Sequence, residues 1–176
     1  PHRERIAVTP FDDTFVNDCG QEYDLILMLD VLEHIEDDTG ALRRLEKLMA
    51  NGARAIITVP AHQWLWSQHD VVNQHFRRYT RDTLCGVLST SKLSIRRVGY
   101  YFGWTLLPMA ARSVLAPAAD TSAVSHYRVS VPFGPLNACL RLISQCDHII
   151  ADRVGMPSGT SLFAVLEKAP ANANEF

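Results

Sequence analysis

The sequence has no excess of positive charge. Its 17 Lys and Arg residues stand against 19 Asp and Glu residues, which gives a formal net charge of −2. General affinity for nucleic acid depends on cations that neutralise phosphates. We therefore expect no nucleic-acid partner.

The cysteines show neither CxxC spacing nor a cluster typical of a zinc site. A chain of 176 residues that is 47% hydrophobic can bury a core without disulfides. These features favour one globular domain, residues 1–176, in a reducing cytoplasm.

An initiator methionine and an apolar signal core are both missing from the first residues, PHRERIAV. The absence of a signal core argues against secretion. The absence of the methionine leads us to expect a fragment of a longer reading frame.

The longest apolar run, Tyr100–Ala119, carries Arg112 as its one charge. Gly103, Pro108 and Pro117 interrupt it, and such residues break a spanning helix. We expect a buried or lid-forming helix, with contact at a membrane surface as the alternative.

A strand, a helix and a second strand follow one another in the first half of the chain. Asp24–Leu29 is apolar on both faces, which is typical of a strand buried inside a parallel sheet. Leucines at helical spacing predict a helix over Asp37–Met49, and Ala53–Pro60 reads as the next strand. This order is that of a parallel crossover unit.

The remaining elements extend the same pattern. A short strand over Arg5–Thr9 and a loop up to Glu22 precede the unit. After it we expect a helix over Arg81–Leu88 capped by Thr80, a strand ending at Tyr101, a helix over Pro135–Arg153 and a strand over Thr160–Lys168. The fold class is α/β, with an open, mostly parallel sheet.

Polar residues follow the second strand directly. Ligands of open α/β sheets bind beyond the carboxyl ends of the strands, where Asp30, Glu33 and His34 are expected. Two plainer interpretations remain open: Asp30 as a cap of the next turn, and His34 as a packing residue.

The stretch from Tyr23 to Ser67 contains an LDVLEH box, an NG turn and an ITVP strand, in that order. It resembles the class I S-adenosylmethionine-dependent methyltransferases of type 11/23. The similarity continues through RRYTRDTL to SGTSLFAVLEK. It implies a Rossmann-like sheet, N-terminally incomplete, in which inserted helices over residues 100–158 cover the acceptor side.

The resemblance also implies S-adenosylmethionine as the cofactor. Its methionine and sulfonium side would lie on residues that end the second strand, with the adenine facing the loop after the first. The implied cofactor-binding residues are Phe11, Asp12, Leu29, Asp30, Val31 and His34.

The glycine-rich loop of this family is not in the sequence. Gly20, Gly40 and Gly52 are isolated and lie in other places. Such a loop lets the backbone approach the ligand closely, so we expect weak cofactor binding or none. Either the chain is part of a larger methyltransferase, or it is a non-catalytic binding or scaffold domain with the same fold.

We predict His34 and His75 as catalytic residues, because imidazole can accept a proton from an acceptor hydroxyl near neutral pH. Two groups of the family are similar in placing acid, acid and histidine in this box, with a later histidine, around a divalent ion. Asp30, Glu33, His34 and His75 match those positions. Asp30 is shorter than the usual Glu, so we assign no metal ligand.

Aromatic and basic residues gather after the third strand. They either line an acceptor pocket or form a loop packed on the sheet, in which Arg77 and Arg78 are solvated. We expect a small-molecule or lipid-linked acceptor, methylated at oxygen, with peripheral membrane contact. An unpaired sheet edge would favour a homo-oligomer.

Overall fold

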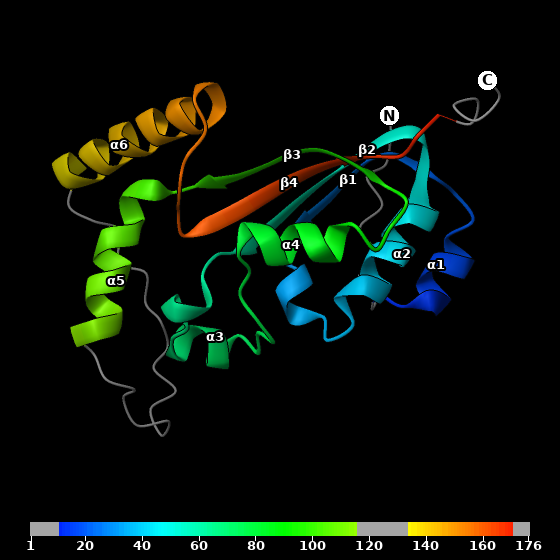
Figure 1. The fold of residues 1–176 in the computed structure, drawn as a ribbon, viewed down its shortest axis with the longest axis horizontal. Coiled ribbons are helices and arrows are strands. Elements are labelled where there is room, and N and C mark those ends of the chain that lie inside the picture. Colours follow the sequence, from blue (N-terminus) through cyan, green and yellow to red (C-terminus); the bar gives the residue numbers. More distant parts are fainter. Residues whose placement is uncertain (1–10, 116–133, 171–176) are drawn as a thin grey trace.

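The computed structural model describes residues 11–115 and 134–170 (Figure 1). Within these ranges the sheet has four strands in the order β1-β2-β4-β3. β1 and β2 are parallel, and β4 is antiparallel to both β2 and β3. The strands are β1 (Tyr23–Leu29), β2 (Met49–Pro60), β3 (Ser94–Tyr101) and β4 (Ser161–Glu167). β1, β2 and β3 therefore run in one direction, as the predicted mostly parallel sheet requires.

The helices alternate with the strands along the chain. They are α1 (Asp13–Cys19), α2 (Asp38–Leu48), α3 (Gln68–Val72), α4 (Arg81–Leu88), α5 (Leu106–Leu115) and α6 (Gly134–Arg153). Short 3₁₀ turns, η1 (Leu32–His34), η2 (Gln63–Leu65) and η3 (Gly103–Thr105), follow the carboxyl ends of β1, β2 and β3. The predicted strand over Arg5–Thr9 lies outside the described residues.

Side-chain caps set the starts of two predicted helices. Asp37 accepts a hydrogen bond from the Gly40 N–H at 2.8 Å at the start of α2. Thr80 accepts one from the Thr83 N–H at 3.2 Å at the start of α4, where the sequence placed the cap. Each bond satisfies an amide that the first turn leaves without an intrahelical partner.

The prediction of a loop before β1 is wrong, because α1 lies in this part of the chain. Asp12 caps this helix by accepting from the Phe15 N–H at 2.9 Å, and Gly20 ends it with a φ of 60°. Val16 is the residue that α1 buries. Seven residues with one buried side chain give little helical periodicity to detect in the sequence.

The core lies on one face of the sheet. Met28, Ile57 and Leu166 point to that face and are at most 5% exposed, as is Leu45 of α2 and Leu84 of α4. Figure 1 shows α1, α2, α3 and α4 gathered on this side of the sheet. α6 lies on the other side, next to β3.

The opposite face of β1 is open, which corrects the expectation that this strand is buried on both sides. Leu25, Leu27 and Leu29 are 55%, 55% and 52% exposed. β1 is one of the two edge strands among the described residues, and the described helices near it lie under the core face. The sequence of β1 therefore carries an apolar surface that nothing in the described chain covers.

Residues 100–115 of the long apolar segment form the end of β3, then η3, then α5, and residues 116–119 lie outside the described part of the chain. None of the described helices combines the length and apolar character needed to cross a membrane. Leu107 of α5 is 80% exposed, so the apolar side chains of this segment are not all buried.

Candidate functional site

The carboxyl ends of the three parallel strands carry unusual backbone conformations. Asp30 after β1, His62 after β2 and Phe102 after β3 have φ values of 52°, 62° and 56°. Gln74, before the predicted catalytic His75, has a φ of 57°. These are all of the non-glycine residues with positive φ in ranges 11–115 and 134–170. Such residues cost of the order of 1 kcal/mol each and gather at functional sites, so this end of the sheet is the candidate site.

Asp30 is exposed and joins β1 to β2. Its N–H donates to the Thr58 carbonyl oxygen and to Thr58 Oγ, both at 3.0 Å, and its carboxylate accepts from the Thr58 hydroxyl at 3.1 Å. Val31 stands at the N-cap of η1, and that turn has no side-chain cap bond. The capping interpretation of Asp30 is therefore wrong, and its carboxylate is instead bonded to Thr58.

Glu33, His34 and His75 form the centre of the site. Their ligand atoms all lie within 4.8 Å of one another, and the two imidazole rings meet edge to face with centroids 4.5 Å apart. η1 supplies the first two residues, and the Phe76 N–H donates to the Glu33 carbonyl oxygen at 2.8 Å. This backbone bond joins the segment of His75 to η1, so two predicted catalytic histidines that are 41 positions apart in the sequence become neighbours.

Glu33 is a buried acid, and one of its carboxylate oxygens has no hydrogen-bond partner among the described residues. Its side chain is 1% exposed, and the oxygen in question is Oε2. The pKa of Glu33 is raised to about 7, chiefly by burial and to a smaller extent by the charges of Asp30 and Asp70, while a backbone hydrogen bond and the charge of Arg78 oppose the rise. The carboxyl group is thus poised to hold or release a proton near neutral pH.

The same three side chains form a donor set for a cation. One carboxylate and two imidazoles suit Zn²⁺, Mn²⁺ or a similar divalent ion, and the unpartnered Glu33 oxygen is compatible with one. Asp30, the fourth residue that the sequence offered, is outside this group. The residues therefore fit a three-ligand site rather than the four-ligand arrangement considered from the sequence.

Asp70 is a site residue that the sequence did not reveal, and it pairs with Arg78, one of the basic residues noted after the third predicted strand. Asp70 is fully buried, and Arg78 is 8% exposed and donates to it through Nε at 2.8 Å and Nη2 at 2.9 Å. Arg77 donates to Asp38 at 2.6 Å. The interpretation of both arginines as solvated is thus wrong, because each neutralises an acid that the fold buries.

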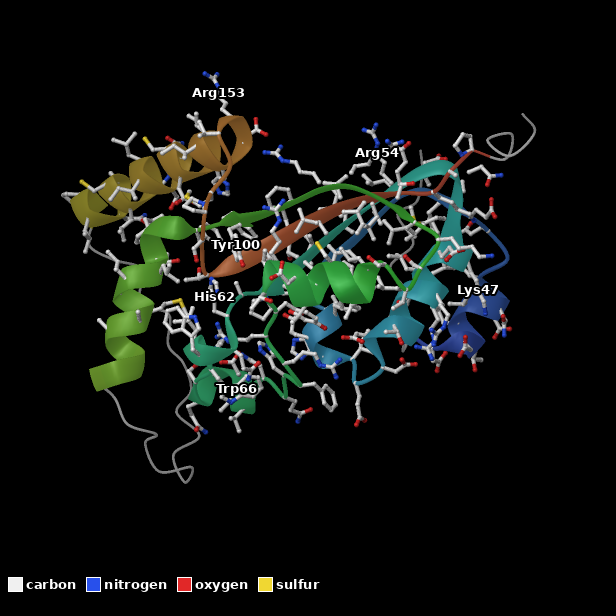
Figure 2. All side chains as sticks on the ribbon, viewed as in Figure 1. Lys47, Arg54, His62, Trp66, Tyr100 and Arg153 are labelled. Carbon is white, nitrogen blue, oxygen red and sulfur yellow. The ribbon has the colours of Figure 1, made fainter. Side chains whose placement is uncertain are left out.

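His62 and Tyr100 form a stacked pair beside this pair of charges. Their rings are 5.3 Å apart and inclined by 7°, and the His62 Nε2 lies 2.8 Å from the Ser158 hydroxyl (Figure 2). Burial lowers the pKa of His62, and the charge of Arg78 lowers it further. His62 therefore contributes a neutral aromatic surface beside Arg78 rather than a second positive charge.

Tyr101 brings a hydroxyl group to the strand ends from β3. Burial raises the pKa of Tyr101, as does the charge of Asp30, and its hydroxyl interacts with the side chains of Thr58 and Ser161. The alternation of β3 sends Tyr101 to the opposite face from Tyr100. The alternation of the strand was the sequence signal that could have assigned Tyr100 and Tyr101 to opposite faces of the sheet.

The remaining predicted cofactor-binding residues lie at the end of β1 and just before α1. Leu29 and Val31 flank Asp30 and are 52% and 36% exposed. Phe11 packs against the edge of the core, and Asp12 is engaged in capping α1. Their role in cofactor binding stays a prediction.

Comparison with known proteins gives a family for over half of the chain. A family model described as a methyltransferase domain matches residues 2–96. This range includes β1, β2 and the Glu33–His34–His75 cluster. No curated protein sequence matches the chain.

Solved structures resemble the chain at low identity. A S-adenosylmethionine-dependent methyltransferase from Archaeoglobus fulgidus is 12% identical with a TM-score of 0.48, over 88% of this chain and 64% of that one. One from Mesorhizobium loti is 12% identical with a TM-score of 0.47, over 84% and 62%. The N-methyltransferase NodS from Bradyrhizobium japonicum, in complex with S-adenosyl-L-homocysteine, is 13% identical with a TM-score of 0.40, over 85% and 47%. The chain thus spans less than two thirds of each of these structures.

Proposed function

We propose that this chain, which belongs to the methyltransferase domain family and has S-adenosylmethionine as its cofactor, directs methyl transfer to a hydroxyl group of a small or lipid-linked acceptor. The observation that carries the proposal is the meeting of Glu33, His34 and His75 at the carboxyl ends of the strands. Chemistry at this edge of an open α/β sheet is the general rule.

The cofactor side of the site is the end of β1. Leu29 and Val31 offer apolar side chains to the methionine portion of the cofactor, and Asp30 offers a carboxylate oxygen to a cationic or hydroxyl group. Phe11 and Asp12 are proposed to lie nearer to the adenine. His34 is exposed at the boundary between this side and the acceptor side.

The proton of the acceptor hydroxyl is proposed to pass to His75, or to His34, as the methyl group moves. A neutral imidazole is a suitable acceptor at neutral pH, and Glu33 can hold a proton beside it. The proposal assigns no metal ligand. If a divalent ion were held by Glu33, His34 and His75, it would lower the pKa of the bound hydroxyl.

The acceptor is proposed to be apolar over much of its length. α5 and α6 carry aliphatic side chains that are about half exposed or more, which suits a lipid-linked acceptor and contact with a membrane surface. The most exposed of these are Leu107 and Leu142, at 80% and 62%, and Val154, which directly follows α6, is 83% exposed. Sedimentation with liposomes tests this part, and a chain that stays in solution while methylating a polar sugar would contradict it.

The open face of β1 supports the view that this chain works as part of a larger assembly. Parallel strands are normally covered on both faces, whereas Leu25, Leu27 and Leu29 are half exposed here. We infer that further polypeptide, including a glycine-rich loop, covers this face in the complete enzyme of the cytoplasm. A second copy of the chain is the other occupant, and light scattering of the purified chain distinguishes a monomer from a homo-oligomer.

The second candidate function is a non-catalytic binding domain. The engagement of Asp12 as a helix cap and the absence of a glycine-rich loop in this sequence favour it. In that case the strand ends would bind a ligand without methyl transfer.

Calorimetric titration of S-adenosylhomocysteine into the folded chain is the first test. Micromolar binding would support a cofactor site within these residues. His75→Ala should then lower methyl transfer by roughly 100-fold and change cofactor affinity by less than about threefold, as expected for a general base. Equal losses in both would contradict the role of His75, and unaltered binding without transfer would favour the binding domain.

A further inference from the structure

The carboxylate of Asp70 is held as a buried anion beneath the site. It lies in the first turn of α3 and is 0% exposed. Beyond the two bonds from Arg78, its Oδ2 accepts from the Ser67 N–H at 2.8 Å and the Ser67 hydroxyl at 3.1 Å. Burial by itself raises the pKa of a carboxyl group, but these donors and His75 outweigh it and hold the pKa of Asp70 below its ordinary value.

The same carboxylate binds one particular nitrogen of His75. Oδ1 of Asp70 lies 2.9 Å from Nδ1 of His75, and the His75 backbone N–H donates to the Asp70 carbonyl oxygen at 2.9 Å. An ionised carboxylate only accepts hydrogen bonds, so the proton of the neutral ring is on Nδ1. The lone pair is then on Nε2, the nitrogen left for the cluster with Glu33 and His34.

The backbone on both sides of His75 fixes the direction of this ring. Gln74 is left-handed, and Phe76 is bonded to the Glu33 carbonyl oxygen. The side chain of His75 is 9% exposed. The ring therefore has little room to turn, and its orientation is set by the fold.

We propose that Asp70 is the positioning residue of the site: it fixes His75 in the Nδ1–H tautomer, and Arg78 holds Asp70 for that task. The inference rests on the proposed function, since only this tautomer presents a basic Nε2 to an acceptor hydroxyl. Asp70 is closed off from the acceptor by its burial and acts only through His75. No group is oxidised or transferred in this arrangement.

The tautomer of His75 can be read directly in the wild-type chain. Long-range ¹H–¹⁵N correlation spectra of the full chain with ¹⁵N-labelled histidine, at about pH 8, distinguish protonated from unprotonated ring nitrogens. His75→Gln assigns the signal, and His148→Gln, at an exposed position of α6, is the control. We expect an excess of Nδ1–H over Nε2–H of roughly tenfold or more, as a charge-assisted bond provides. A ring protonated on Nε2 would overturn the proposal.

Asp70→Asn separates positioning from mere packing, because it keeps the shape and removes the charge. The tautomer excess of His75 should fall at least about threefold in a variant that keeps the wild-type circular dichroism. A folded variant with the wild-type excess would overturn the proposal, and if the variant does not fold, the wild-type spectrum alone decides. Because the spectra need no turnover, a chain that binds no cofactor would contradict the proposed function and leave this result standing.

Discussion

The two faces of the sheet have nearly the same sequence character but opposite environments. Along β1, Met28 is 5% exposed under the helices, whereas its neighbours Leu27 and Leu29 are 55% and 52% exposed on the other side. Along β4, Leu162, Ala164 and Leu166 are fully buried, and the residues between them are half-buried. The core face therefore supplies most of the burial that stabilises the described domain, and the open face of β1 contributes little to it.

The largest expected effect is a matched pair of leucine truncations, one on each face. Leu166→Ala removes a fully buried side chain and should lower the free energy of unfolding by about 3 kcal/mol, from lost burial and the cavity left behind. Leu27→Ala, half exposed on the open face, should cost less than about 1 kcal/mol. Urea denaturation of both variants gives the comparison. Similar losses would mean that the open face is covered in solution.

A second test uses the buried acid at the end of the core face. The pKa of Glu33 is about 7 in the folded chain against 4.5 as its ordinary value. Its ionisation therefore opposes folding: the penalty is absent below about pH 4.5, grows as the pH rises, and is complete above about pH 7. Glu33→Gln should raise the free energy of unfolding by about 2 to 3 kcal/mol at pH 8 and by little at pH 4.

The exposed Glu36→Gln is the control for this prediction and should show no such pH dependence. Glu33→Gln could instead be less stable than the wild type at pH 8, with a chelator lowering the stability of the wild type. That result would mean that a bound cation compensates the ionised carboxylate of Glu33. That outcome would favour the three-ligand site over the protonated acid.

The smallest expected effect concerns α6, the helix on the open side. Arg97 of β3 donates to the Asp152 carboxylate at 2.7 Å and to the carbonyl oxygens of Ala151 and Asp152 at 2.9 and 2.7 Å. It thereby satisfies acceptors in the last turn of α6. Arg97→Gln should lower the global free energy of unfolding by about 1 kcal/mol or less.

Amide hydrogen exchange shows where that change acts. Protection should fall in α6 and stay constant in α4, which is anchored by Leu84 and Leu88 in the core. A uniform loss in both helices would indicate that the two sides of the sheet unfold as one unit.

The elements with strong local signals were predicted from the sequence. α2, α4, β3, α6 and β4 lie where periodicity, caps and turn residues placed them, and the mostly parallel α/β sheet is confirmed. β2 begins at Met49 rather than at Ala53, so the predicted NG turn is wrong and its residues belong to the strand. α1 was missed although Asp12 and Gly20 are residues typical of helix ends, because seven residues give too short a periodic pattern. The double-sided burial of β1 was inferred from composition, which records the apolar surface but not whether anything covers it.

The site was predictable only where its residues follow a recognisable strand. Glu33 and His34 could be placed at the candidate site because they directly follow a strand, whereas Asp30 lies outside their cluster. His75 joins them through the backbone bond from Phe76 to Glu33, which no local pattern encodes. Asp70 and Arg78 could not be paired in advance, because a loop of eight positions allows many geometries. Left-handed residues such as His62 and Phe102 also have no sequence signature, since neither is Gly or Asn.

The loop between β2 and α4 is fastened at two points, and this restricts how a substrate can arrive. Inside the loop, Asp70 accepts a hydrogen bond from Arg78. At the second point, Asp38 of α2 accepts from Arg77 at 2.6 Å and from the Tyr79 hydroxyl at 3.0 Å. Opening this loop would break the buried pair of Asp70 and Arg78 and the partly buried pair of Asp38 and Arg77 at once, which makes it a poor gate.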